Sequence, residues 1–165
     1  MSRTPIDIVV QGRFHAFALA KALIEQDKPV RVLTNYPAFM AARFGVPPAN
    51  VTGFATLGLL HKYAYRWNLA ERMPLLDRFL HRQFSIWAAG KITRTGPVAV
   101  HVFSGVALEL LRHLQSFKNP VATLLMRGSG HIIDQYHDLS REGKRAGSDI
   151  EKPSPWMIRR ELSEY

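Results

Sequence analysis

Short β-branched runs alternate with segments of helical spacing along the first part of the chain. Ile6–Val10 is an apolar run that ends near Gly12, which predicts a strand followed by a tight turn. Phe14–Gln26 then predicts a helix whose single apolar face lies on a sheet. Pro29–Thr34 supplies a second apolar run. A strand–helix–strand unit of this length implies a parallel pair of strands with a right-handed crossover.

The same pattern returns after the middle of the chain. Pro97–Phe103 predicts a strand, and Ser104–Gly105 predicts the turn after it. Val106–Phe117 predicts a helix, and Pro120–Met126 predicts the next strand. A small additional strand is predicted near Asn50–Ala55. We therefore expect an α/β fold, with a Rossmann-like parallel sheet flanked by helices.

Four loops are expected to share one edge of this sheet. In a doubly wound sheet, the ligand crevice lies outside the carboxyl ends of the strands. The loops at those ends are Gly12–Arg13, Asn35–Tyr36, Ser104–Gly105 and a fourth loop that contains Arg127, Ser129 and His131. We expect them to converge on one binding site, with His15 as a minor contact near its rim.

The segment 56–94, between the two halves, mixes basic and aromatic side chains. It carries seven Lys or Arg residues against two acidic ones, and so holds more than half of the net charge of +9. Pro74 predicts a division into two helices, because proline suits the first turn of a helix and not its interior. Two interpretations stay open. Either the segment faces an anionic membrane or a phospholipid-linked acceptor, or its aromatic residues are core and its charges are solvated. The aromatic residues in question are Tyr63, Tyr65, Trp67, Phe79, Phe84 and Trp87.

Composition narrows the class of protein. The 165 residues suit one domain, and a hydrophobic share of 47% is that of a globular chain. The lack of cysteine excludes disulfide scaffolds, thiolate metal sites and cysteine nucleophiles. The positive charge favours an anionic partner, such as nucleic acid, phosphate or an acidic membrane face.

No apolar run is long enough for a targeting segment or a spanning helix, so we expect a cytoplasmic protein, with peripheral binding to the inner face of the membrane left open.

Few residues form a known catalytic pattern. Gly12 either serves the turn alone or seats a phosphate at the N-terminus of the next helix. Phe14 and Phe17 occupy the second and third glycine positions of the dinucleotide fingerprint, which argues against a nicotinamide cofactor. The seven histidines show no metal-ligand spacing, so we expect no metal.

His131 begins a helix after a glycine-containing loop, and either hydrogen-bonds a hydroxyl group or only caps and packs. His101 is interpreted as a core histidine.

Several segments together resemble one family of bacterial enzymes. Residues 7–17 (DIVVQGRFHAF) and 33–37 (LTNYP) resemble the start of the retaining glycosyltransferases of family four, which have the GT-B fold. A later set of segments resembles the region before the crossover between the two domains of that family. This set consists of Arg127–Ile132, Glu142, Gly147, Pro155–Trp156 and Arg160–Tyr165. The resemblance spans nearly the whole chain.

The resemblance implies a reaction and a separate role for each of two domains. Such enzymes have two Rossmann-like domains, of which the N-terminal one mostly contacts the acceptor and the C-terminal one holds the nucleotide-sugar. We therefore expect residues 1–165 to be the acceptor-side domain of a sugar transferase, a fragment or truncated product without the C-terminal domain and inactive alone. By resemblance, Gly12, Arg13 and His15 lie near the sugar diphosphate and His131 near the reacting sugar. The nucleotide-sugar is a co-substrate, the acceptor is a glycan or lipid-linked, and no cofactor or metal is implied.

Two other functions stay open. The first is a basic α/β module that binds nucleic acid, which is motivated by the charge alone, since no recognised nucleic-acid motif is present. The second is an inactive remnant without a ligand. Neither a nucleophile elbow nor a phosphate-binding Walker sequence occurs in the chain, so hydrolase and nucleoside-triphosphatase functions lack support.

Overall fold

Five short parallel strands form the centre of the molecule, which the computed structural model describes over residues 5–67, 69–93, 96–97, 99–118 and 121–165. The strands are β1 (Ile6–Val10), β2 (Val30–Thr34), β3 (Val51–Gly53), β4 (Ala99–Phe103) and β5 (Ala122–Met126). Their order in the sheet is β3-β2-β1-β4-β5. The predicted α/β, Rossmann-like class is confirmed.

The chain winds outward from β1 in both directions. β1 pairs with β2 on one side, where Ile8 lies opposite Val32, and with β4 on the other, where Ile8 lies opposite His101. The strand order therefore reverses between β1 and β4. This point is the topological switch at which α/β sheets bind their ligands.

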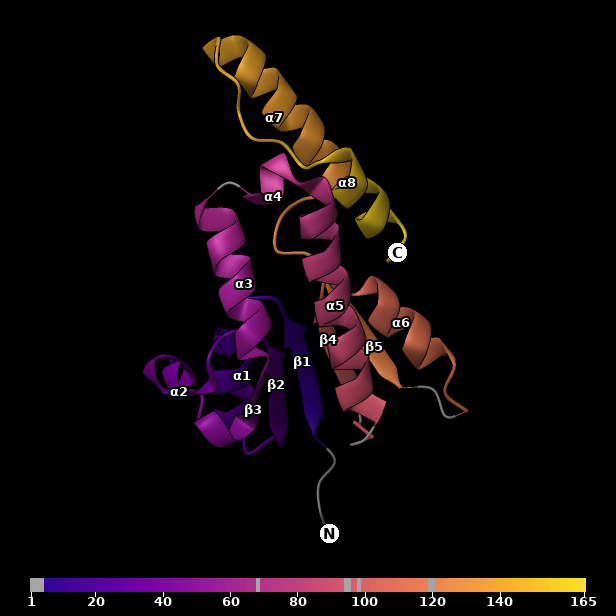
Figure 1. The fold of residues 1–165 in the computed structure, drawn as a ribbon. Helices are drawn as coiled ribbons and strands as arrows, with labels where there is room; N and C mark the ends of the chain where they lie inside the picture. The colour runs from indigo at the N-terminus through magenta and orange to yellow at the C-terminus, as the bar shows by residue number, and fades with distance from the viewer. Residues whose placement is uncertain (1–4, 68, 94–95, 98, 119–120) are drawn as a thin grey trace.

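Helices cover both faces of the sheet. On one face lie α3 (Ala55–Arg66), α5 (Pro74–Thr93) and α6 (Leu108–Gln115), as Figure 1 shows. On the other face lie α1 (Ala16–Glu25) and the single-turn α2 (Ala38–Ala41), with two 3-10 turns, η1 (Ala42–Phe44) and η2 (Pro48–Asn50). A short helix, α4 (Leu69–Arg72), joins α3 to α5.

Each face buries its own apolar cluster. Val9, Leu33 and Phe84 are fully buried between the sheet and the helices α3, α5 and α6. Ile8, Val32 and other residues are buried on the opposite face, against Phe17 of α1. Each side chain of this kind stabilises the fold by about 1.5–3 kcal/mol. Because β1 and β2 are covered on both faces, apolar residues that face either side follow one another in both strands. The one charged residue in each strand, Asp7 and Arg31, pairs with the other, with two hydrogen bonds from the guanidinium to the carboxylate.

Most predicted boundaries hold within two residues. Pro74 begins α5, as predicted from its fit to a first turn. The first helix starts at Ala16 and not at Phe14, because Phe14 has a φ of +40°, a left-handed conformation that a helix does not contain. Two residues of the predicted strands, at positions 98 and 120, lie outside the described residues.

One part of the sheet is left open. Leu124 and Met126 of β5 are 56% and 36% exposed, on the face where α1 packs over β1 and β2. His101 of β4 points to the same face and is only half-buried, so the interpretation of His101 as a core residue is wrong. The reason is that α7 (Ile132–Ala146) and α8 (Pro155–Leu162) lie beyond the carboxyl ends of the strands, as Figure 1 shows, and not over this face.

Buried charges fix α8 against the turn between β4 and α6. Arg160 donates from Nε to the backbone oxygen of Gly105 at 2.6 Å and forms a two-bond ion pair with Glu109. The Glu164 carboxylate accepts hydrogen bonds from the backbone N–H groups of Gly105, Ala107 and Leu108 at 2.8–3.1 Å. Burial raises the pKa of Glu164, while these three amides favour its charged form. The first turn of α6 is therefore capped by Glu164, two residues after the end of α8.

Candidate functional site

A crevice of about 290 Å³ lies at the switch point, beyond the carboxyl ends of β1, β4 and β5. Two of the four predicted loops meet there, one through Ser104 and Gly105 and the other through Arg127 and Ser129. Three further polar residues line the crevice, and the sequence did not single them out: Gln11, His81 and Glu161.

Gln11, the first residue after β1, has an unpartnered polar atom. Its Nε2 atom is buried and has no hydrogen-bond partner among the described residues. A buried donor without a partner costs about 1–3 kcal/mol, so such atoms in native structures usually have a role. Because Gln11 lines the crevice, an oxygen of a ligand in the crevice is a fitting partner. Its place directly after a buried strand was the only sequence signal for it.

Arg127 is held by three side chains. Its Nε donates to Glu161 Oε2 at 2.5 Å, and its terminal nitrogens donate to Ser129 Oγ and to Gln135 Oε1, both at 2.6 Å. The guanidinium is therefore fixed in orientation and paired with a carboxylate. Arg127 forms part of the wall of the crevice and is not a free cation.

An aromatic ring forms the apolar wall of the crevice. Phe14 lines it and is 53% exposed, and its ring meets that of Phe103 edge-on with centroids 5.6 Å apart. Gly128 allows this position, because a Cβ atom there would lie 2.0 Å from Phe14 Cε1. The crevice thus places polar groups beside a ring, which is typical of small-molecule sites.

The turn after β1 is closed by hydrogen bonds within the protein. Gly12, with a φ of +78°, donates its N–H to Asn35 Oδ1 at 2.5 Å, and its carbonyl accepts from Thr34 Oγ1 at 2.5 Å. Asn35 is buried. In this geometry Gly12 and Asn35 hold two loops together, and the N–H group of Gly12 is already used.

Three other predicted residues lie on the α1 and α2 side. The guanidinium of Arg13 lies over the Phe44 ring, 4.3 Å from its centroid. His15 is exposed beside Phe14, and Tyr36 packs on Phe17 with ring centroids 5.6 Å apart. None of the three is among the residues that line the crevice. Their contact with a sugar diphosphate or an acceptor stays a prediction.

His131 is exposed at the start of α7. Its ring stacks on that of Tyr165 with centroids 5.6 Å apart, and its side chain makes no capping hydrogen bond to the helix. It is not among the residues that line the crevice. Its proximity to a reacting sugar stays a prediction.

A larger pocket of about 630 Å³ adjoins the crevice. It lies between the start of α5 and the helices α7 and α8, and it shares Arg127, Met157 and Glu161 with the crevice. Arg78 and Trp156 both line it, and the guanidinium of Arg78 lies over the Trp156 ring with its carbon 5.9 Å from the ring centroid.

A polar cluster connects α3 and α5 beside both pockets. Asp77 accepts a hydrogen bond from the Tyr65 hydroxyl at 2.7 Å and lies 3.3 Å from Nδ1 of His81. Burial works to raise the pKa of Asp77, but His81 and Tyr65 outweigh it and lower the pKa. Burial, together with the nearby His81, lowers the pKa of His61 to about 4. Burial and Asp77 raise the pKa of Tyr65. His81 is thereby positioned at the crevice by Asp77.

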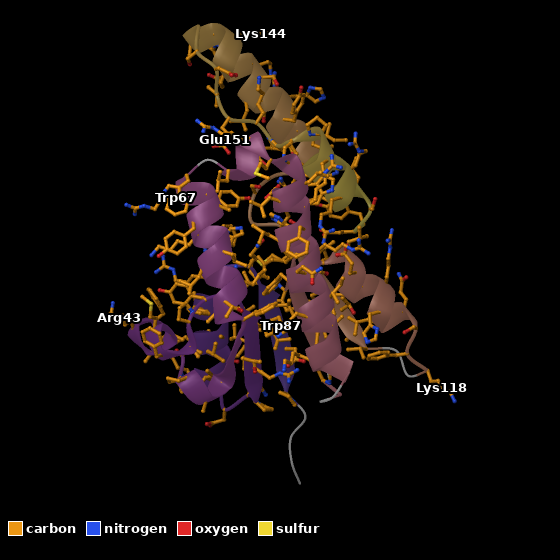
Figure 2. All side chains as sticks on the ribbon, in the orientation of Figure 1. Arg43, Trp67, Trp87, Lys118, Lys144 and Glu151 are labelled. Atoms are coloured by element: carbon orange, nitrogen blue, oxygen red, sulfur yellow. The ribbon has the colours of Figure 1, made fainter. Side chains whose placement is uncertain are left out.

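The basic and aromatic segment divides between core and surface. Phe84 is buried, and Trp87 is partly buried with its ring stacked on Phe54 at 5.1 Å. The other four aromatic side chains are about half exposed, and Figure 2 shows Trp67 projecting away from the end of α3. The core interpretation therefore holds for Phe84 and Trp87, whereas contact of the exposed side chains with a membrane or a phospholipid-linked acceptor stays a prediction.

Within the described parts of the chain, no group of three or more histidine, aspartate or glutamate side chains is placed to hold a metal ion. The helices described here include none that is long and apolar enough to cross a membrane. No protein-family model, curated protein or solved structure matches the chain.

Proposed function

We propose that residues 1–165 form the acceptor-side domain of a glycosyltransferase, which moves a sugar from a nucleotide-sugar to a glycan or a lipid-linked acceptor. The observation that carries this proposal is the buried, unpartnered Nε2 atom of Gln11 in the switch-point crevice. A neutral amide donor in a crevice suits a hydroxyl oxygen of a sugar.

The rest of the crevice suits a saccharide as well. Ser104 and Ser129 bring two hydroxyl groups to its lining, and Phe14 offers an exposed ring against which the C–H face of a sugar packs. The two charged groups, Arg127 and Glu161, neutralise each other. A site of neutral hydrogen-bonding groups and one aromatic ring favours an uncharged polyol over a strongly charged ligand.

Sugar transfer by this domain requires a second one. The resemblance places the nucleotide-sugar mostly on a C-terminal domain, so groups outside residues 1–165 are needed to stabilise the charge that develops on the leaving diphosphate, beside Gly12, Arg13 and His15. We therefore expect the 165-residue chain to bind the acceptor and to show no transfer by itself.

Peripheral membrane binding is part of this proposal. Large apolar side chains of α3 and of the residue after it are about half exposed or more, namely Leu59, Leu60 and Tyr63 on the helix and Trp67 at its end. Lys62 and Arg66 are exposed on the same helix. A helix with apolar side chains and cations toward solvent suits the surface of an anionic bilayer. Binding to vesicles should rise with anionic lipid and fall with salt, and indifference to both would contradict it.

Nucleic-acid binding is the competing function, because the net charge is +9. It predicts an affinity for duplex RNA or DNA that falls steeply with salt as counterions are released. The apolar residues among the cations of α3 favour a lipid surface over a phosphate backbone. Tight, salt-sensitive duplex binding without saccharide binding would favour the competing function.

The proposal is tested by binding to an array of defined saccharides. The purified chain is compared with Gln11→Ala and with Arg82→Ala, a control on the exposed side of α5. We expect saccharide-dependent binding that Gln11→Ala reduces about tenfold, the effect of one lost hydrogen bond of about 1.4 kcal/mol, and that the control retains. Absence of binding to every saccharide, or equal binding by Gln11→Ala, would contradict it.

A further inference from the structure

Arg78, on the second turn of α5, lines the larger pocket and forms no ion pair with the acidic side chains that the structure describes. Its Nε atom is buried and has no hydrogen-bond partner among the described residues. The guanidinium of Arg78 lies over the ring of Trp156, with its carbon 5.9 Å from the ring centroid. A guanidinium that lines a pocket and has no ion-pair partner among the described residues is expected to have a ligand that carries acceptor oxygens, and phosphate is the group that its fork geometry fits.

The other charges of this pocket leave Arg78 with an excess of positive charge. Arg127 is paired with Glu161, and Asp77 is engaged by Tyr65 and His81. The remaining lining charges are two exposed cations, Arg159 and Lys152, against one exposed carboxylate, Glu151. Lys152 lies 3.6 Å from Asp149, and both side chains are exposed, so this pair neutralises little of its charge.

Of the two aromatic rings that line the pocket, that of Trp156 is occupied by cations. Arg160 also lies over the Trp156 ring, with its guanidinium carbon 5.6 Å from the centroid. A ring that already holds two guanidinium groups offers little surface for a sugar to stack on. The ring instead orients the side chain of Arg78, which favours an anionic group over a neutral sugar in this pocket.

Apolar side chains are exposed on the chain segment that flanks the lining residue Pro74. Pro74 and Tyr65 line the pocket. Met73 and Leu75, the chain neighbours of Pro74, are 53% and 75% exposed. An anion site beside exposed apolar side chains fits a ligand with a charged head and an apolar tail.

We infer that the larger pocket binds the phosphate or diphosphate group of a lipid-linked acceptor, with Arg78 as the anchoring cation. The apolar tail then leaves over Met73 and Leu75, and the saccharide end reaches the crevice at Gln11, which adjoins the pocket through Arg127 and Glu161. This inference rests on the proposed function, because it names the class of acceptor for the same site.

Isothermal titration calorimetry of the 165-residue chain tests the inference with two probes. Farnesyl diphosphate, kept below the concentration at which it forms micelles, carries both the head and an apolar tail, whereas inorganic pyrophosphate carries the head alone. We expect farnesyl diphosphate to bind more tightly than pyrophosphate. Arg78→Ala should weaken it about tenfold to a hundredfold, the effect of lost charge-assisted hydrogen bonds.

Two further variants sharpen the test. Arg78→Lys keeps the charge and loses the fork, so its affinity should lie between those of the wild type and Arg78→Ala. Arg82→Ala removes an equal charge one turn further along α5, outside the pocket, and should change the affinity less than twofold. Circular dichroism and thermal melting of each variant confirm that it is folded.

The outcomes separate the inference from the proposed function. If neither probe binds, or if Arg78→Ala and Arg82→Ala weaken binding equally, the inference is overturned. If pyrophosphate binds as tightly as farnesyl diphosphate, the phosphate belongs to a soluble ligand and the lipid-linked class is overturned. Saccharide binding that depends on Gln11 without phosphate binding leaves the proposed function intact, whereas phosphate binding without saccharide binding contradicts that function.

Discussion

The guanidinium of Arg127 and the carboxylate of Glu161 form one ion pair that lines both the crevice and the larger pocket, with Nε and Oε2 2.5 Å apart. The pair joins the loop after β5 to α8, and both side chains are about nine-tenths buried. The position of α8 therefore determines the shape of both pockets.

Removal of one partner of this pair should be costly. We expect Arg127→Ala to lower the free energy of unfolding by about 3–5 kcal/mol, because it leaves the carboxylate of Glu161 buried and unpaired. The double variant Arg127→Ala/Glu161→Ala should lose less than the sum of the two single variants, as measured by urea unfolding. Additive losses would mean that the two side chains do not interact.

A methyl group at position 128 should alter the crevice and spare the fold. The new Cβ of Gly128→Ala would lie 2.0 Å from Phe14 Cε1 and would displace the half-exposed Phe14 ring. We expect the melting temperature to change little and saccharide binding to fall. Gly130→Ala is the control, because an added Cβ there meets nothing within 4 Å. Equal binding by both variants would exclude a role for the Phe14 wall.

A methyl group at position 58 should instead act on stability. A Cβ in Gly58→Ala would lie 2.0 Å from the backbone oxygen of Asn35, which cannot move without the loop after β2. We expect a loss of about 1–3 kcal/mol, the usual cost of overpacking. Gly90→Ala on α5 has open space and should stabilise by about 0.5–1 kcal/mol through helix propensity. Thermal melting of the two variants, with shifts in opposite directions, checks this prediction.

Stability should fall with acid between about pH 6.5 and pH 4. His61 has a folded-state pKa of about 4 against 6.5 in the unfolded chain, mainly because burial disfavours its charged form. Between these two values the unfolded chain binds more protons, so stability rises with pH across this window and is lost as the pH falls. Urea unfolding at several pH values should show a shallower slope for His61→Gln. An unchanged slope would contradict the burial of a neutral His61.

His131 gives a prediction about a polypeptide that supplies both domains. Because its side chain makes no capping hydrogen bond, His131→Ala should change stability by no more than about 0.5 kcal/mol. Turnover should fall by about 10²–10⁴-fold if the imidazole contacts the reacting sugar. A destabilised variant with normal turnover per folded molecule would rule out the catalytic role.

The sequence predicted the sheet well because β1 and β2 are buried on both faces, so each is a short, mostly apolar and β-branched run, interrupted only by Asp7 or Arg31 before its last residues. It did not predict which face of α3 points inward. Helical spacing shows that Leu57 and Ala64 share a face, but only the packing shows that they are buried while Leu59 and Leu60 are exposed.

Two features of the site were also beyond sequence reasoning. The burial of Arg160 depends on Glu109, which lies 51 residues away in the chain, and charged residues in a short helix are ordinarily read as solvated. In the sequence Gln11 is simply a polar residue after a strand. The structure singles it out, because its buried Nε2 atom has no hydrogen-bond partner among the described residues. Both properties arise from tertiary contacts, and local patterns do not encode them.

The central claim is that the switch-point crevice is a saccharide site organised by Gln11. The most direct test is an NMR titration of the ¹⁵N-labelled chain with the saccharide that binds best in the array. We expect shifts in the side-chain amide of Gln11 and in the backbone amides of Ser104 and Gly128, with little change in the control position Gly90. Shifts confined to other surfaces, with the Gln11 side-chain signal unmoved at saturation, would contradict the claim.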